Sequence, residues 1–386
     1  MKTLVSINWQ SLLKSVESTS SAIEEKLTQA RFLDKGELID GAANELPADL
    51  IPDLGTFEFD WNNYLTAQKT NHPNGDPDLI KTLSYQQEIQ QKIDFSRQTA
   101  LISGGAEQSL LLILSSLLSP GDSIAFANPS YFHSTAVFQT LGINRYSVPL
   151  ISSNFDLDQL EEIILKHRIK LLLLNPTLEN PTGENLTMHQ RQSVLKLCQQ
   201  YQIPIVEDDV FGWLVNDKKS LPTLKTLSPD NVIYISSLSK LLGSNTRIGW
   251  IIAPQAIGQR LLRVQKQLDM APRMLAQRLV NNALTSSKFT LGLVQLTHTL
   301  ENRRNAVIKI FHKFCPKWQF SIPSGGFYLW ISQTDPNIFE NLLAEQILVK
   351  PGTIYGASKY EFRFNIARMD QSKRAILAEK LQKLKR

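Results

Sequence analysis

The chain has 386 residues, of which 42% are hydrophobic and 20% are charged, and its formal net charge is +5. These values are ordinary for a folded globular protein and exclude fibrous and intrinsically disordered classes. Basic residues are scattered except for KLQKLKR at the C-terminus, which we interpret as a solvated helix end, so no nucleic acid partner is expected.

The same overview gives three further expectations. Cys198 and Cys315 lie far apart and have neither disulfide-framework nor metal-site spacing, so no metal is expected. We find no leader peptide, and the longest apolar run, SLLLILSSLL, is too short to span a bilayer. A cytoplasmic protein that does not bind membranes is therefore expected.

The first third of the chain changes character twice. Residues 1 to about 34 place apolar residues at three- and four-residue steps, which predicts an amphipathic helical arm. Residues 41–76 are rich in Pro, Asn, Asp and Gly, which predicts loops and short turns.

Between about 100 and 255, short apolar runs alternate with helical segments. The runs are SIAFANP, KLLLLNPT, IPIVEDDVF, NVIYISSLSK and RIGWIIAP. Strands that are apolar throughout and separated by helices predict a mostly parallel sheet covered on both faces. Among the helices, the one after Thr187 begins with TMHQ, a capping-box pattern.

From about residue 256 the pattern is helical, and alternation then returns in GGFYLWI and EFRFNIA. This order predicts a second, α+β domain. We expect residues 1–45 to form an arm that contributes to the small domain, 46–265 a large cofactor-binding domain, and 266–386 the small C-terminal domain.

Four of the central apolar runs end in polar residues. The ends are Asn128 to Tyr131, Asn175-Pro176 leading to ENPTG, Glu207 to Asp209, and Ser236 to Lys240. The carboxyl ends of parallel strands share one edge of a sheet, where ligands bind. This convergence indicates a cofactor site.

A lysine, a carboxylate, hydroxyls and an arginine at one edge fit an aldehyde cofactor that carries a phosphate. Lysine forms the Schiff base, and a carboxylate that faces a pyridine nitrogen keeps it protonated, so the ring withdraws electrons. Hydroxyls, arginine and a helix N-terminus bind phosphate. The stretch ISGGAEQSLLL (102–112) supplies such a terminus after two glycines.

These motifs resemble the fold-type I pyridoxal-phosphate (PLP) enzymes, specifically the class I/II aminotransferases. The nearest likeness is to the 2-aminoadipate/kynurenine-type branch and to the aminotransferase domain fused in some winged-helix regulators. Five separated motifs follow the family's order, between IDGAANELPADLIP (39–52) and FRFNIAR (362–368). The resemblance implies an α/β fold with a large, mostly parallel sheet domain and a smaller C-terminal α+β domain. It also implies a homodimer with active sites at the subunit interface.

The resemblance also implies roles for single residues. Lys240 would hold the Schiff base and move the proton between the substrate and the cofactor. Asp208 would face the pyridine nitrogen, with Asp209 as the alternative. Asn180 would donate to the 3′-oxygen and contact substrate, and Tyr131 would stack on the ring.

The remaining roles concern anions. Arg363 would clamp the substrate α-carboxylate, a bidentate task. The phosphate would be held by backbone N–H groups of the SGGAEQ loop and by side chains beyond the lysine strand: Gly105, Ala106, Glu107, Ser237, Ser239 and Arg247. Ala106 offers no hydroxyl, so that loop would bind through its backbone alone.

Each residue also has a purely structural alternative. Lys240 could be a surface lysine, the aspartates turn or cap residues, and Asn180 a turn residue. Tyr131 could be a core aromatic, and Arg363 could belong to a structural ion pair.

Three positions depart from the family pattern. Phe211 stands where the family has a tyrosine that binds the 3′-oxygen, and in TNHPNGDPDLI Thr70 and Ile80 replace a tyrosine and an arginine. A lost donor to that oxygen shifts the pKa of the Schiff base. As a guess, Trp213 and His72 fill the space released.

The leading functional hypothesis is a PLP-dependent aminotransferase that moves an amino group from an amino acid to a 2-oxo acid in ping-pong order. The alternative is another PLP-dependent reaction on an amino acid, as in a decarboxylase, lyase or oxidase of specialised biosynthesis. A ligand-sensing regulator is not expected, because the residues before the first motif are too few for a winged helix.

Overall fold

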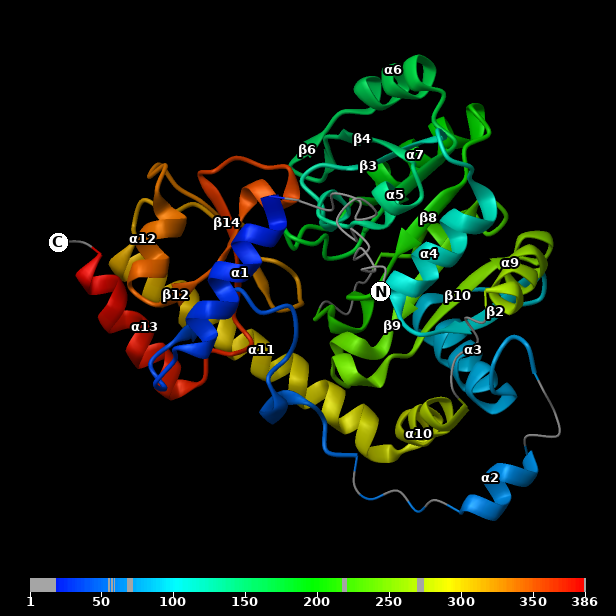
Figure 1. Ribbon diagram of the computed structural model, residues 1–386, viewed down its shortest axis with the longest axis horizontal. Helices are drawn as coiled ribbons and strands as arrows, with labels where there is room; N and C mark the ends of the chain where they lie inside the picture. Colours follow the sequence, from blue (N-terminus) through cyan, green and yellow to red (C-terminus); the bar gives the residue numbers. More distant parts are fainter. Residues whose placement is uncertain are drawn as a thin grey trace, which may run out of the picture.

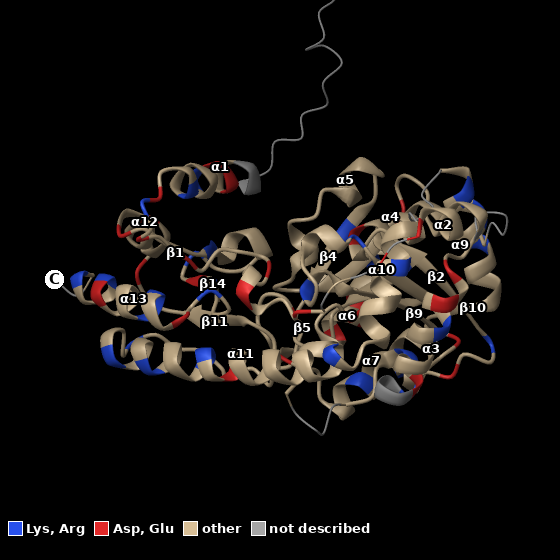
Figure 2. Ribbon diagram, turned by 90° about the horizontal axis from the view of Figure 1, so that it is seen from below, with Lys and Arg blue, Asp and Glu red and all other residues tan. Residues whose placement is uncertain are grey.

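The computed structural model describes residues 19–384 except for 55, 57, 59, 68–71, 217–220 and 269–273. Figure 1 shows a larger body around a central sheet and a smaller body beside it. Helix α11 (Ser287–Phe314) runs along both bodies, as both ribbon views show (Figures 1 and 2). The site described below lies where the two bodies meet.

The larger body contains a seven-stranded sheet in the order β2-β10-β9-β8-β7-β3-β4. All neighbours beyond β9 are parallel, whereas β10 runs antiparallel to both β9 and β2. The predicted mostly parallel sheet is therefore confirmed, with RIGWIIAP as its antiparallel member. The strands are β2 (Gln98–Ser103), β3 (Ser123–Ala127), β4 (Asn144–Val148), β7 (Leu171–Leu174), β8 (Ile205–Asp208), β9 (Val232–Ser237) and β10 (Gly249–Pro254).

The strands are apolar throughout because helices cover both faces of this sheet. In β7, Leu171 and Leu173 pack in one cluster with residues of α4 and α9, whereas Leu172 and Leu174 pack in another with α6 and α7. The predicted capping box at Thr187 is confirmed at the start of α7. The covering helices are α4 (Ala106–Leu117), α6 (Leu157–His167), α7 (Met188–Gln200) and α9 (Gln255–Gln267).

The smaller body has an antiparallel sheet in the order β11-β14-β13 (Tyr328–Ser332, Glu361–Asn365 and Lys350–Pro351). Strand β14 alternates, as its sequence predicts: Phe362 and Phe364 pack against Trp318 and Phe311. Since successive side chains of a strand point to opposite faces, Arg363 points away from this apolar layer. The arginine thus faces the larger body.

The N-terminal segment packs on the smaller body. Helix α1 (Thr19–Phe32) buries Leu27 in a cluster with Leu38 and Leu348. Strand β1 (Ile39–Asp40) pairs in parallel with β12 (Ile347–Leu348). The arm before residue 19 lies outside the described residues, and the proposed domain boundaries at 45 and 265 stay a prediction.

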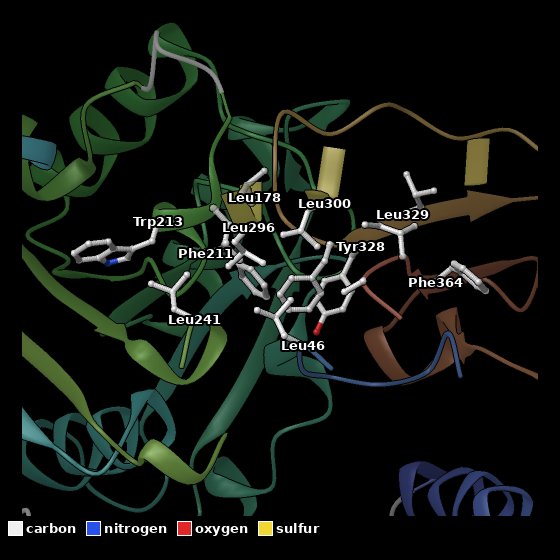
Figure 3. Close-up of a cluster of buried hydrophobic side chains, with 14 of the residues drawn as sticks. Leu46, Leu178, Phe211, Trp213, Leu241, Leu296, Leu300, Tyr328, Leu329 and Phe364 are labelled. Carbon is white, nitrogen blue, oxygen red and sulfur yellow. The ribbon is translucent and has the colours of Figure 1, made fainter. Parts of the chain in front are cut away.

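An apolar cluster joins the two bodies beside the site (Figure 3). The Phe211 ring of the larger body lies 5.5 Å from each of the Phe327 and Tyr328 rings of the smaller body. Leu46, from the segment after β1, packs in the same cluster. Burying such large side chains stabilises the relative position of the bodies by about 1.5 to 3 kcal/mol for each side chain.

The remaining elements are short or peripheral. Residues 41–76, predicted as loops and turns, also contain a 3₁₀ turn at Ala48–Leu50 and the short helix α2. No helix in the described part of the chain combines the length and hydropathy that a membrane span needs. The elements are α2 (Trp61–Ala67), α3 (Pro77–Gln91), α5 (Val137–Thr140), α8 (Leu224–Leu227), α10 (Met274–Thr285), α12 (Ile338–Ala344), α13 (Gln371–Lys383), β5 (Leu150–Ile151) and β6 (Asn154–Phe155).

Candidate active site

A cavity of about 230 Å³ lies at the carboxyl ends of β8 and β9, next to the start of α4. The structure brings most of the predicted site residues together around it. Those that line the cavity are Ala106, Glu107, Tyr131, Asn180, Asp208, Ser237, Ser239, Lys240 and Arg247. Gly105 and Arg363 lie directly behind this lining, in contact with Arg247 and Asn180 respectively.

One end of the cavity is suited to an anion. Helix α4 begins after Gly105, whose φ of 114° favours glycine. Gly105 has no side chain to cap the helix, so the first N–H groups of the helix are available to a ligand. A Cβ at Gly105 would lie 3.5 Å from Nη2 of Arg247, and one at Gly249 would lie 2.8 Å from the Gly105 backbone. Gly249 therefore lets its strand approach the Gly105 loop closely, and the Arg247 guanidinium lies in contact range of that loop, as a phosphate cradle requires.

Two hydroxyls complete this end. The Ser237 and Ser239 Oγ atoms lie 3.0 Å apart, and Ser237 donates to the main-chain oxygen of Ile248. Burial raises the pKa of Glu107 above its usual value, and Arg247 and Lys240 oppose that rise. This end of the cavity therefore combines the start of α4, the two serine hydroxyls and the cations Arg247 and Lys240, which also interact with the Glu107 carboxyl group.

Lys240 ends the short 3₁₀ turn that follows β9. Its Nζ donates to the main-chain oxygen of Asn44 at 2.7 Å and lies 5.5 Å from the centre of the Phe211 ring. The lysine is half-buried and lines the cavity, so its amine lies at a possible ligand site.

Asp208 and Asp209 are both buried but face different surroundings. Asp208 lines the cavity, and its Oδ1 accepts the N–H of Val210 at 3.2 Å. The Asp209 carboxylate accepts the Tyr234 hydroxyl at 2.8 Å. A side chain at Gly212 would also collide with the Asp209 carboxylate. Of the two alternatives, the geometry favours Asp208 as the carboxylate that a ligand meets.

Burial dominates the ionisation of both aspartates. It raises the pKa of Asp208 to about 7, although hydrogen bonds from Asn175 and Val210 oppose the rise. Burial and the neighbouring Glu207 raise the pKa of Asp209 to about 8. A cationic group opposite Asp208 would relieve its desolvation.

Asn180 and Arg363 meet across the two bodies. Nη1 of Arg363 donates to Oδ1 of Asn180 at 2.8 Å, which leaves the Asn180 amide nitrogen to donate into the cavity. Tyr131 is fixed beside them, because its N–H donates to the main-chain oxygen of Asn180 at 2.7 Å. The buried guanidinium of Arg191 holds the same loop through the Pro176 oxygen.

Some lining residues were not assigned a role from the sequence. Asn44 and Glu45 lie in IDGAANELPADLIP, which contributed to the resemblance but carried no role, and Asn175 opens the NPTLENPTG stretch. Ser244 and Val210 also line the cavity. The place of Asn44 and Glu45 inside a motif was the only sequence signal that they line the cavity. Their contact with the cavity depends on how the two bodies pack, which no local sequence pattern specifies.

The structure describes two of the three residues that depart from the family pattern, and it places them in different surroundings. Phe211 lines the cavity, and its side chain has no hydrogen-bond donor that could replace the tyrosine hydroxyl of the family. Ile80 packs, half-buried, against the main core, and Thr70 lies outside the described residues. The guess that Trp213 and His72 fill the space was wrong: Trp213 packs against Trp250 and Phe289, and His72 is exposed.

The residues fit PLP on structural grounds. The anion cradle would hold the phosphate, Lys240 would supply the amine, and the buried Asp208 lacks a cationic partner at hydrogen-bond distance among the described side chains. Asn180 would donate to the ring oxygen, and Tyr131 would cover the ring face. An α/β fold with this cavity defines the class of PLP-dependent enzymes of fold type I.

Comparisons with known proteins identify the family within this class. The sequence profile of the family "Aminotransferase class I and II" matches residues 42–381, and the chain belongs to this family. PLP is the cofactor of the family.

Two solved structures have similar folds. An archaeal alanine:glyoxylate aminotransferase is 25% identical with a TM-score of 0.84, covering 98% of this chain and 99% of its own. The kynurenine aminotransferase of Pyrococcus horikoshii is 20% identical, also with a TM-score of 0.84 and with coverage of 98% and 99%.

A curated relative has a different description. The HTH-type transcriptional regulator NorG of Staphylococcus aureus (strain USA300) is 32% identical over 286 residues, or 72% of this chain. The match spans 64% of NorG, which is less than two thirds of its length.

We predict that Asp208→Asn stabilises the cofactor-free protein at pH 8 but weakens its affinity for PLP about 10- to 100-fold. The folded-state pKa of about 7 lies above the ordinary value of 3.8. Folding therefore favours the protonated acid, and stability decreases as pH rises from about 4 to 7. Urea unfolding at pH 5.5 and 8, with and without PLP, measures both effects.

Asp209→Asn is the matched control. It removes a similar desolvation cost but leaves the cavity unchanged, so the stabilisation by PLP should stay as in the unsubstituted protein. Loss of PLP stabilisation in Asp209→Asn, with retention in Asp208→Asn, would contradict the assignment.

Proposed function

We propose that this chain is a PLP-dependent aminotransferase that transfers an amino group from an amino acid to a 2-oxo acid in ping-pong order. The observation that carries the proposal is the convergence, in one cavity, of an amine, a buried carboxylate and an anion cradle, with an arginine behind the asparagine. Family membership supports it.

The chain's own groups have separate tasks in this reaction. PLP, when bound, supplies a ring that accepts the electrons of the substrate Cα–H bond. Lys240 removes the proton from Cα as general base and returns it as general acid. Arg363 would bind the α-carboxylate, Asn180 would hold the ring oxygen, and the ionised Asp208 would stabilise the protonated ring nitrogen.

Substrate identity stays open within this proposal. The alanine:glyoxylate and kynurenine activities belong to the similar structures by their titles. Phe211 presents an apolar ring beside Lys240, and Glu45 is the one carboxylate on the side of the smaller body among the described lining residues. The cytoplasmic location and the absence of a nucleic acid partner stay predictions.

The proposal is tested by an absorbance titration of the purified protein with single amino acids. We expect a PLP band that borohydride removes and that Lys240→Ala abolishes, because Lys240 is the one lysine among the described residues that line the cavity. A substrate amino acid should convert the band to that of pyridoxamine phosphate, and a 2-oxo acid should restore it.

Other outcomes separate the alternatives. Release of carbon dioxide or peroxide without pyridoxamine phosphate would favour the decarboxylase, lyase or oxidase alternative. A band that responds to an amino acid, without any oxo acid product, would favour a second candidate: a sensor domain of a transcriptional regulator. The likeness to NorG is the observation behind that candidate. Absence of a band would contradict all three.

We also propose a homodimer. Two observations support it besides the family: Figure 1 shows α2 standing at the periphery of the larger body, and both α2 and α11 expose apolar side chains. On α11, Leu291 and Val294 are 65% and 62% exposed at a spacing of three residues, so they share a helix face. Such a face is typical of a protein interface.

We predict that the double substitution Leu291→Glu and Val294→Glu converts a dimer into a monomer. Carboxylates in the centre of an apolar interface lose hydration without gaining partners. Light scattering after size-exclusion chromatography measures the mass. Leu165→Glu on α6, at a residue 61% exposed, is the control and should keep the mass of two chains. A monomer before any substitution would contradict the proposal.

A further inference from the structure

The guanidinium of Arg363 is enclosed and already hydrogen-bonded. Arg363 is 1% exposed, and its centre lies 3.8 Å from the Tyr328 ring centre. Nη1 donates to Oδ1 of Asn180 at 2.8 Å, and Nη2 donates to Oδ1 of Asn44 at 2.6 Å. Because a guanidinium only donates, the oxygen of each amide must face it.

This arrangement conflicts with carboxylate binding. A carboxylate binds arginine through two parallel N–H bonds. Nη1 and Nη2 each donate to an amide oxygen, whereas Nε has no hydrogen-bond partner among the described residues. Both amides line the cavity and Arg363 does not, so a carboxylate that approaches the guanidinium from the cavity must displace one of them. Asn180 is buried and fixed within its loop, whereas Asn44 is exposed at the cavity. Asn44 is therefore the side chain that moves.

The main chain around Asn44 is held independently of that side chain. Nδ2 of Asn365 donates to the oxygens of Ala43 and Glu45 at 3.0 and 3.1 Å. The Tyr328 hydroxyl donates to the Asn44 main-chain oxygen at 3.0 Å. Rotation of the Asn44 side chain alone can thus uncover Arg363 while the backbone stays in place.

We propose that Asn44 is a specificity-determining residue, whose side-chain amide occupies the α-carboxylate subsite and is displaced by the substrate's carboxylate. The proposal rests on the proposed function, since it takes Arg363 as the carboxylate clamp. A carboxylate is charged and accepts two parallel N–H bonds from a guanidinium, whereas the Asn44 amide oxygen is neutral and accepts one bond from Nη2. Only a ligand with a full carboxylate therefore displaces the amide efficiently, and simple amines and amides leave it in place.

The test compares two probes on the PLP-loaded protein by isothermal titration calorimetry. 2-Methylalanine carries an α-carboxylate and no Cα hydrogen, so it binds without transamination, and isopropylamine lacks the carboxylate. The ratio of their dissociation constants measures the contribution of the carboxylate. Circular dichroism and thermal unfolding of each variant show whether the fold is retained.

Asn44→Ala and Asn44→Asp should change this ratio in opposite directions. Asn44→Ala removes the competing acceptor and should tighten 2-methylalanine about tenfold, with isopropylamine unchanged. Asn44→Asp places a carboxylate on Arg363 and should weaken 2-methylalanine by about tenfold or more, again without affecting isopropylamine.

Results that contradict the role of Asn44 can be distinguished from results that contradict the role of Arg363. Weaker 2-methylalanine binding in Asn44→Ala would make Asn44 a ligand of the carboxylate and overturn the proposal, as would unchanged binding in both variants. Arg363→Ala tests the clamp itself. If it keeps the preference for 2-methylalanine, the assignment of Arg363 in the proposed function fails, whatever Asn44 does.

Discussion

The hydrogen bond from Arg363 to Asn180 connects the smaller body to the larger one at the place where the cavity forms. It orients the Asn180 amide so that its nitrogen points to the cavity, and it holds the arginine against the Tyr328 ring. The apolar contact of Phe211 with Phe327 and Tyr328 stabilises the same junction. The site depends on both, because neither body contains all of its groups.

Burial of charge is the second constraint on the site. Desolvation raises the pKa of Asp208 and of Asp209, and no described cation lies within hydrogen-bond distance of the Asp208 carboxylate. Asp209 has the Tyr234 hydroxyl as its partner within the protein. Asp208 lines the cavity and has the Val210 N–H and the Asn175 side chain as its partners, and this difference makes it suited to a cationic ring nitrogen. The cofactor cavity is thus a place where the fold is locally less stable until a ligand binds.

Much of this could be predicted from local patterns. Fully apolar runs predicted a covered parallel sheet, and polar residues directly after β3, β7, β8 and β9 predicted that their side chains meet, since parallel strands end at one edge. The capping box at Thr187 depends on four consecutive residues and was equally accessible. The antiparallel course of β10 was not, because an apolar strand has the same composition in either direction.

The role of Asn44 could not be inferred from sequence. Its contacts join residues more than 190 positions apart, to Lys240 and Arg363, and no local pattern specifies such pairs. The choice between Asp208 and Asp209 also required the structure, as both are buried and adjacent. For Trp213, by contrast, a sequence pattern misled the prediction. Because Trp213 is close to Phe211 in sequence, it was expected to fill space in the cavity, but its ring packs in the core.

Transfer of isotopically labelled nitrogen tests the central claim most directly. The protein, loaded with PLP, is incubated with a mixture of labelled amino acids lacking alanine and glutamate, together with pyruvate and 2-oxoglutarate, and the products are analysed by mass spectrometry. An aminotransferase yields labelled alanine or glutamate and the oxo acid of the donor. Labelled ammonia, a decarboxylated amine, or binding without any labelled product would contradict the account.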